Sequence, residues 1–366
     1  MERISPHQFM TLGGAVLMGT TFLPVASIVS AACGRDGWMI VLPAFVLGIP
    51  YGLMVLSLLS QFPNKNLLQI SEIVFGKWIG KLIGVFYILI TGYFGGLLLG
   101  QAGDIYERSI MPLTPIGLFY LGTIILVFYL CKSGIEVFAR FSEAVFPLIL
   151  LALILNLTLS ISRIEPGELL PILSEGVMPL FWGGLKVAPF AMEYILFMAG
   201  ISAFLPTDMK EIGQLRREVC RAVFLVGILD MFVALQQILV FGPFETTRVV
   251  YGLLVLGKMV EVSRTVAGVE SLFLGVWLGA LVIKISAFLF TTVWGLETVM
   301  NLKGLKWQIA VCSVFMGIAF GFVRGSALIS EIAFVDNYLI LPFAAIWILG
   351  LWGAVRWKKG KNIRGN

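Results

Sequence analysis

The chain combines high hydrophobicity with a low content of charge. Of its 366 residues, 59% are hydrophobic and 13% are charged, with a mean hydropathy of +0.97 and a formal net charge of +5. Soluble domains carry roughly a quarter charged residues, so this composition excludes an ordinary soluble enzyme or binding module. Apolar runs of about 17 to 25 residues recur along the chain, and each can cross a bilayer as a helix. The sequence predicts an all-α polytopic membrane protein.

Charged and Pro/Gly-rich breaks divide the chain into about ten expected membrane spans. They cover approximately residues 8–31, 38–60, 79–103, 114–131, 138–161, 187–205, 219–241, 268–297, 307–323 and 337–356. An even number of spans places both termini on one side of the membrane. Most lysines and arginines fall in the loops of that side, and basic residues favour the cytoplasm. We therefore expect a single transmembrane domain over residues 1–366 with both termini cytoplasmic, and the net charge gives no reason to expect a nucleic-acid partner.

The first span contains a stretch that weakens its helix. Within LMGTTFLP, residues 17–24, Gly19, Thr20 and Thr21 precede Pro24. Proline lacks an amide donor and clashes with the preceding turn. Broken backbone at mid-membrane depth is tolerated where it is buried in protein or lines a cavity, and freed amides there can bind a carboxylate. A simple proline kink is the alternative reading of this segment.

The sixth span shows a related pattern. Pro189 and then Glu193 interrupt VAPFAMEYILF, residues 187–197. Two interrupted helices five spans apart are typical of inverted-repeat transporters, which hold substrate where the two breaks meet. We therefore expect inverted repeats at approximately residues 8–161 and 187–356, with a binding site between the broken helices. The alternative for Glu193 is a buried carboxylate that is hydrogen-bonded for packing.

The seventh and eighth spans also carry ionisable residues. Asp230 lies in GILDMFVALQQ, and Lys284 lies in GALVIKISAFLF. A lysine near the bilayer centre costs at least about 2.5 kcal/mol on insertion scales, so Lys284 should face the protein interior and find a partner. For Asp230, a functional role and a buried polar contact between helices both remain open.

The sequence contains no constellation for catalysis or metal binding. It lacks a Walker loop and a GxSxG motif, and its single histidine excludes a histidine triad. The four cysteines lack metal-ligand spacing and are expected at different levels of the membrane, so a disulfide framework is not expected. We expect no catalytic residues, no metal and no cofactor.

Five motifs occur in a fixed order along the chain. They are ISPHQF at the start, LLQISEIVFGKWIGKLIG before the third span, LLPILSEGVMPLFWG before the sixth, FAMEYILF within it, and VESLFLGVWLGALVIKI in the eighth. Together they resemble the B subunits of spore germinant receptors, the GerAB or endospore germination permease family, over essentially the whole chain. The resemblance implies the amino acid–polyamine–organocation transporter superfamily and its LeuT-type fold, a five-plus-five inverted repeat with broken first and sixth helices.

The resemblance also implies a small-molecule site between the first, third, sixth and eighth helices. Carried over by position, the candidate ligand-binding residues are Gly19, Thr20, Tyr93, Phe190, Glu193, Lys284 and Phe288. Lys284 and Phe288 are four residues apart, so they share one helix face. Gln101 and Asp230 are candidates for a polar path or for coupling, although relatives can carry an acid at the position of Gln101.

Three roles remain open for Lys284. In the first, its ammonium group replaces the coupling sodium ion of other LeuT-type proteins and braces the eighth helix against the first. Alternatively, it contacts the carboxylate of a ligand, or it forms a structural ion pair with Glu193 or Asp230. The broken stretch shows no evident asparagine or aspartate ligands for sodium.

The function that the resemblance implies is that of a germinant-receptor subunit. Such a subunit binds a small nutrient germinant, an amino acid in the first instance, and triggers spore germination together with A and C subunits in the spore inner membrane. The second hypothesis is an active amino acid permease that works by alternating access. The missing sodium ligands favour the receptor.

Overall fold

The computed structural model describes residues 3–109, 111, 113–206, 208–249, 251–259, 269–321 and 326–364. Throughout these ranges the secondary structure is helical, without a strand. The helices that correspond to the expected spans are α1 (Pro6–Thr21) with α2 (Val25–Cys33), α3 (Trp38–Val46) with α4 (Gly48–Gln61), α6 (Lys77–Ser109), α7 (Ile116–Lys132), α8 (Ile135–Leu159), α9 (Met178–Gly200), α10 (Met209–Arg248), α12 (Val269–Val299), α13 (Leu305–Gly321), and α14 (Ser326–Val335) with α15 (Leu341–Arg364). The all-α expectation is confirmed.

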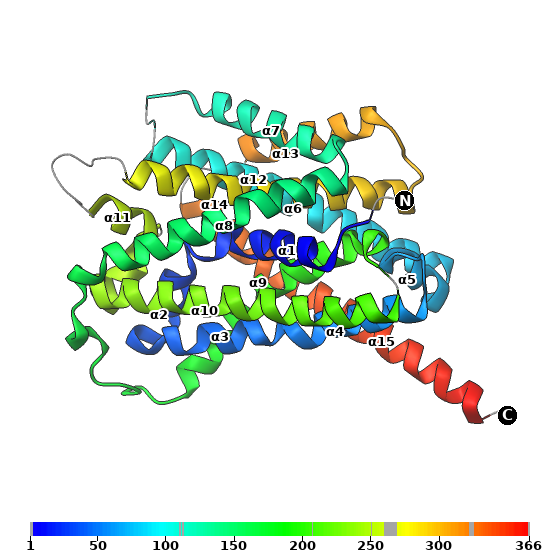
Figure 1. The fold of residues 1–366 in the computed structure, drawn as a ribbon, viewed down its shortest axis with the longest axis horizontal. Coiled ribbons are helices and arrows are strands. Elements are labelled where there is room, and N and C mark those ends of the chain that lie inside the picture. The colour runs from blue at the N-terminus through cyan, green and yellow to red at the C-terminus, as the bar shows by residue number, and fades with distance from the viewer. Residues whose placement is uncertain are drawn as a thin grey trace.

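The expected number of spans agrees with these helices. In the described ranges, seven helical stretches are long and apolar enough to cross a membrane, and α1 with α2 forms one further, bent span. The shorter helices α7 and α13 are also apolar and correspond to the fourth and ninth expected spans. Figure 1 shows the helices running along one axis, with both termini at the same end of the bundle. Which side of the membrane that end faces stays a prediction.

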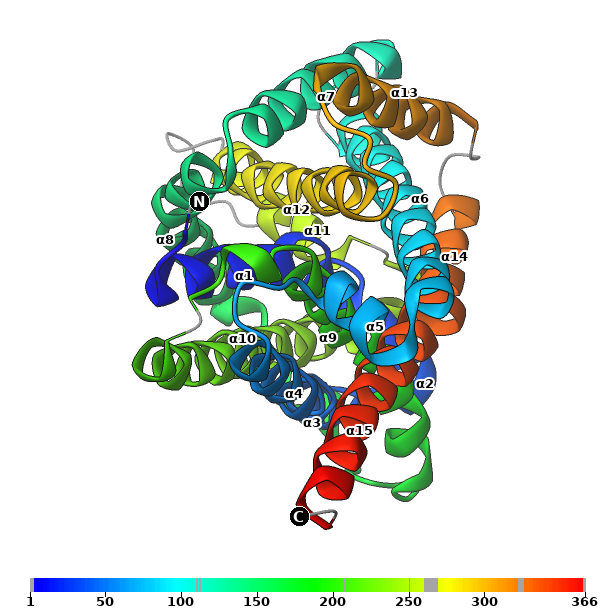
Figure 2. The same cartoon turned by 90° about the vertical axis from the view of Figure 1, so that its right-hand side faces the viewer.

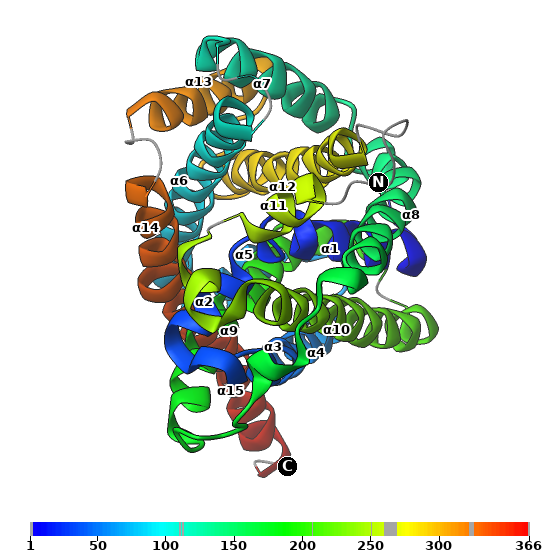
Figure 3. The same cartoon turned by 90° about the vertical axis from the view of Figure 1, so that its left-hand side faces the viewer.

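Views along the bundle show which helices position its centre. In Figures 2 and 3, α1 lies between α12 and α10, and α7 and α13 form the outer edge beyond α6 and α12. The part of α1 from Thr11 to Thr21 is entirely buried, as is α9 from Val187 to Gly200. These two stretches therefore lie in the core of the bundle, and polar groups on them are withdrawn from lipid and water.

The first span is broken where the sequence predicts. Ser5 caps α1 through a reciprocal capping box with Gln8, and α1 ends at Thr21. Residues 22–24 form a turn, after which α2 continues at 58° to α1. Pro24 cannot donate to the preceding turn, so the helical ladder stops there, and α2 begins anew with Ile28 donating to the Pro24 carbonyl.

The sixth span differs from the expectation. The helix α9 passes through Pro189 and is uninterrupted from Met178 to Gly200. Proline removes a single amide donor, and a helix in a bundle tolerates this loss when neighbouring helices hold its course. Pro189 and Glu193 therefore lie within one continuous helix, and the break expected at this position is corrected. A short 3₁₀ turn follows only at Ser202–Phe204.

The described fold also contains two further short α-helices and two local irregularities. The short helices are α5 (Leu67–Phe75), after the second span, and α11 (Gly252–Met259), after the seventh; residues 260–268 lie outside the described part. The helix α10 contains a kink at Gly242, where φ is 75°. Between α14 and α15, residues Asp336–Ile340 adopt a π-helical turn.

Candidate binding site

A buried lysine joins three helices at the centre of the bundle. Lys284 of α12 is fully buried, and its ammonium group forms an ion pair with the Glu193 carboxylate of α9. The same ammonium group donates a hydrogen bond to the Thr20 hydroxyl of α1. Its nitrogen also lies 6.0 Å from the ring centroid of Phe94 on α6. One cation thus connects elements from both halves of the chain.

The close approach of α1 to α12 depends on Gly19. A methyl group at this position would lie 2.8 Å from the Lys284 Cβ and 3.0 Å from the Ala280 carbonyl oxygen. Only glycine lets the two helices meet at this distance. The ammonium group contacts Thr20 near the C-terminal end of α1, where the helix dipole favours a positive charge.

Two further carboxyl groups lie near the ion pair. Asp336, in the π-helical turn, is 3% exposed, and its carboxyl group lies within hydrogen-bonding range of the Glu193 carboxyl. Asp230 of α10 is 1% exposed and lies beside the Thr21 side chain. Of the two acids expected as partners, Lys284 pairs with Glu193 and is not within ion-pair distance of Asp230.

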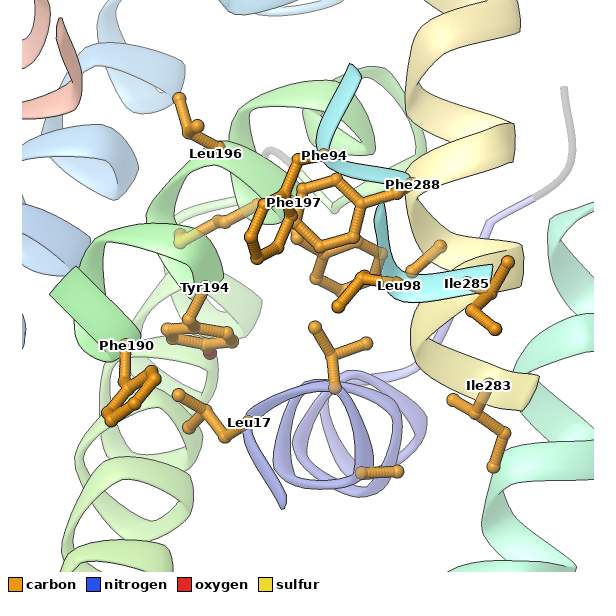
Figure 4. Packing of buried hydrophobic residues seen from close by; sticks show 14 of the residues in the cluster. Leu17, Phe94, Leu98, Phe190, Tyr194, Leu196, Phe197, Ile283, Ile285 and Phe288 are labelled. Carbon is orange, nitrogen blue, oxygen red and sulfur yellow. The ribbon is translucent and has the colours of Figure 1, made fainter. Parts of the chain in front are cut away.

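Aromatic side chains surround the charged groups. Phe94 of α6 and Phe288 of α12 form an edge-to-face pair with ring centroids 5.0 Å apart. Figure 4 shows these two rings together between the helices, and it shows Phe190 and Tyr194 on α9 near Leu17 of α1. Phe288 and Phe190 therefore lie near the centre of the bundle; that they line a ligand site stays a prediction.

Two candidate residues on α6 lie away from Lys284. Tyr93 donates a 2.8 Å hydrogen bond to Glu331 on α14. Gln101 is 3% exposed, and no donor in the described ranges bonds its Oε1. One turn further, Asp104 accepts a hydrogen bond from the Tyr251 hydroxyl at 3.3 Å. The polar groups of α6 thus continue from Gln101 towards α11, at the end of the helix away from α5.

Sequence reasoning did not select Phe94 or Asp336. Tyr93 and Phe94 are adjacent in TGYFGG, and one residue rotates a helix face by about 100°. The sequence does not show which of the two residues faces the protein interior, because the whole stretch is apolar or small. Asp336 was placed one residue before the tenth expected span, whereas the structure extends helix well before it, with α14 beginning at Ser326. The signal that could have identified Asp336 is the apolar sequence on both sides of this acid.

The described side chains offer no evident metal site. No group of three histidine, cysteine, aspartate or glutamate side chains in the described ranges is placed to hold a metal ion. The four cysteines, Cys33, Cys131, Cys220 and Cys312, are free thiols. The chemistry available at the centre is that of an ammonium group, carboxyl groups and hydroxyls, which suits recognition of a small charged molecule.

The family relationship follows from comparison with known sequences. A family model described as spore germination protein, of the spore permease type, matches residues 3–323. The chain belongs to this spore germination protein family. Spore germination protein KB of Bacillus subtilis strain 168 is 23% identical over 368 residues, covering 98% of this chain and 96% of that protein. Spore germination protein YndE of the same strain is 24% identical over 215 residues, 59% of this chain and 57% of that protein.

Comparison with solved structures shows the fold. The structure of MhsT in complex with L-phenylalanine aligns with a TM-score of 0.73 at 12% identity, covering 95% of this chain and 89% of that one. Mhp1, a nucleobase-cation-symport-1 family transporter with bromovinylhydantoin bound, aligns with a TM-score of 0.67 at 14% identity, covering 95% and 78%. The protein is thus an integral, multi-pass membrane protein with the LeuT-type fold.

Proposed function

We propose that this protein is the ligand-binding B subunit of a spore germinant receptor, with an amino acid as its germinant. Membership of the spore germination protein family supports the role in germination. The single observation that carries the ligand class is the buried Lys284–Glu193 ion pair beside Thr20, at the break of the first span. The subunit acts with A and C subunits in the spore inner membrane, with both of its termini in the cytoplasm.

The geometry of the site suits a zwitterion. An amino acid carries an ammonium group and a carboxylate, and the site offers carboxyl groups and an ammonium group on buried side chains. The first amides of α2 lack partners within the helix and lie just beyond the break, where they can receive a carboxylate. The aromatic rings of Phe94 and Phe288 restrict the ligand to a small side chain.

Signalling requires that the ligand bind two conformations unequally, because equal affinity shifts no equilibrium. Lys284 holds α1, α9 and α12 together through Thr20 and Glu193. A ligand that competes for either contact changes the free-energy difference between two arrangements of these helices. The resulting movement of α1 or α12 is the event that partner subunits would detect.

The experiment that tests the proposed function measures binding and transport in the same preparation. Purified protein in proteoliposomes is exposed to each of the twenty amino acids, and its melting temperature is recorded. Counterflow of labelled amino acid is then measured in the same vesicles. We expect at least one amino acid to raise the melting temperature of the wild type but not of Lys284→Met, without accumulation of label.

The matched control is Lys81→Met, which removes an exposed lysine from α6. This variant should keep the wild-type response. If no amino acid stabilises the wild type, the proposed ligand class is refuted. A response of Lys284→Met equal to that of the wild type would instead remove Lys284 from the site.

An active amino acid permease is the second candidate function. The observation that favours it is the likeness to transporter structures, including one with L-phenylalanine bound. Label that accumulates through the wild type but not through Lys284→Met would establish this function. The receptor role would then be secondary to transport.

A further inference from the structure

Two carboxyl groups meet beside a single ammonium group. Glu193 comes from α9 and Asp336 from the π-helical turn, and their carboxyl groups lie within hydrogen-bonding range of each other. No donor in the described ranges hydrogen-bonds to Glu193 Oε1 or Asp336 Oδ1. Two carboxylates at this range repel, whereas one proton between them turns the contact into an O–H···O hydrogen bond.

The charges around the pair are balanced when the pair binds one proton. Buried side chains that are charged or carry a hydroxyl group face this centre from three other helices; they are Lys284 of α12, Asp230 of α10, and Thr20 and Thr21 of α1. Lys284 is the single cation among the buried side chains of the described ranges. One ammonium group neutralises one carboxylate, so the Glu193–Asp336 pair becomes neutral overall when it also holds one proton.

The backbone around Asp336 is itself irregular. The π-helical turn Asp336–Ile340 separates α14 from α15 and packs against α9. A π-helical turn inserts an extra residue and so changes the direction in which the following side chains point, and such turns occur frequently at functional sites. The turn is thus an independent structural feature located where Asp336 meets Glu193.

We propose that Glu193 and Asp336 together form a proton-binding site, which holds one proton in the ligand-free protein and releases it when the ammonium group of a bound amino acid takes its place. The charge balances, since one ammonium group enters as one proton leaves to water and both carboxyl groups become ionised. The release step rests on the proposed function, whereas the bound proton does not. Binding then weakens by up to tenfold per unit fall in pH, because protons compete with the ligand.

The bound proton is tested without any ligand. Infrared spectra of the purified full-length protein at pH 7 distinguish the C=O stretch of a protonated carboxyl group from the bands of carboxylates. We expect the wild type to show the protonated band and Asp336→Asn to lose it. Lys284→Met should increase the band by about one carboxyl equivalent, because a second proton replaces the missing cation.

Control variants show which carboxyl group gives rise to the infrared band. Asp230→Asn should leave the band of the pair in place, because Asp230 lies beside Thr21 and outside the pair. If Asp336→Asn does not fold, Glu193→Gln provides the same test from the other side. Loss of the band in Asp230→Asn, or an unchanged band in both Asp336→Asn and Glu193→Gln, would overturn the proton site.

Proton release is tested on the unmodified wild type. Each of the twenty amino acids is titrated calorimetrically at pH 7 in phosphate and in Tris, whose ionisation enthalpies differ, and the difference in heat gives the number of protons released. We expect about one proton per bound amino acid. Binding without proton release would overturn the proposed exchange of the proton for the ammonium group of the ligand. If no amino acid binds, the proposed function and the exchange fall together, and the infrared result alone decides whether the pair holds a proton.

Discussion

Replacing Lys284 with methionine gives the sharpest test of the buried charges. Methionine fills a similar volume but removes the single cation among the buried side chains of the described ranges. Leaving Glu193 ionised without its partner costs about 3–5 kcal/mol. Protonating a glutamate of ordinary pKa, about 4.3, costs about 3.7 kcal/mol at pH 7. The two costs are similar, and protonation sets the upper limit, so we expect a loss of stability of at most about 3.7 kcal/mol at pH 7.

This mechanism predicts a dependence on pH with a defined sign. A proton replaces the missing cation, so the loss falls by about 1.4 kcal/mol for each unit by which the pH is lowered. Unfolding of Lys284→Met and wild type, followed by tryptophan fluorescence in detergent at pH 7 and pH 5.5, measures the difference. The double variant Lys284→Met/Glu193→Gln should recover most of the stability at both pH values, because it removes the unpaired charge. An equal loss at both pH values, without recovery in the double variant, would refute the reasoning.

Three further predictions concern helix packing around the site. Gly19→Ala should destabilise the protein by about 1–3 kcal/mol through overpacking against α12. The control Gly122→Ala adds a methyl group in open space on α7 and should not change stability. Equal losses of stability in thermal melting of the two variants would contradict the packing argument. Tyr93→Phe should cost about 1 kcal/mol by removing the hydrogen bond to Glu331 while leaving amino acid binding intact, and a lost ligand response in the melting assay would place Tyr93 in the binding site after all. Trp347→Phe should cost about 1 kcal/mol, because the indole of α15 donates a 2.8 Å hydrogen bond to α5, and an unchanged melting temperature would show that this contact contributes no stability.

The spans and the first break could be predicted because each depends on local sequence. Long apolar runs have few alternatives in a membrane, and the missing amide of Pro24 acts on its own turn. The choice of Glu193 over Asp230 as the partner of Lys284 depends on how α9 and α12 are rotated about their axes, which their apolar composition does not reveal. The burial of Lys284 followed from cost alone, since a lysine at that depth must avoid lipid.

The missed features depend on contacts between distant segments. Pro189 does not end α9, because the outcome of a proline in a helix depends on the helices packed around it. Asp336 reaches Glu193 through a π-helical turn, and no periodicity in the sequence specifies such a turn. The choice between Tyr93 and Phe94 likewise depends on the rotation of α6 against α12 and α14, which only tertiary packing sets.

The uninterrupted α9 changes how a ligand would be held. In an inverted repeat with two broken helices, freed backbone groups from both breaks supply the polar contacts. In the described part of this chain, the first span is broken between α1 and α2, whereas the sixth is continuous and contributes the Glu193 carboxyl in place of helix ends. Backbone groups carry fixed partial charges, whereas a carboxyl group gains or loses a whole charge with its proton. If a ligand binds at this site as we propose, its recognition will depend on its charge and on pH in a way that a site of paired helix ends would not.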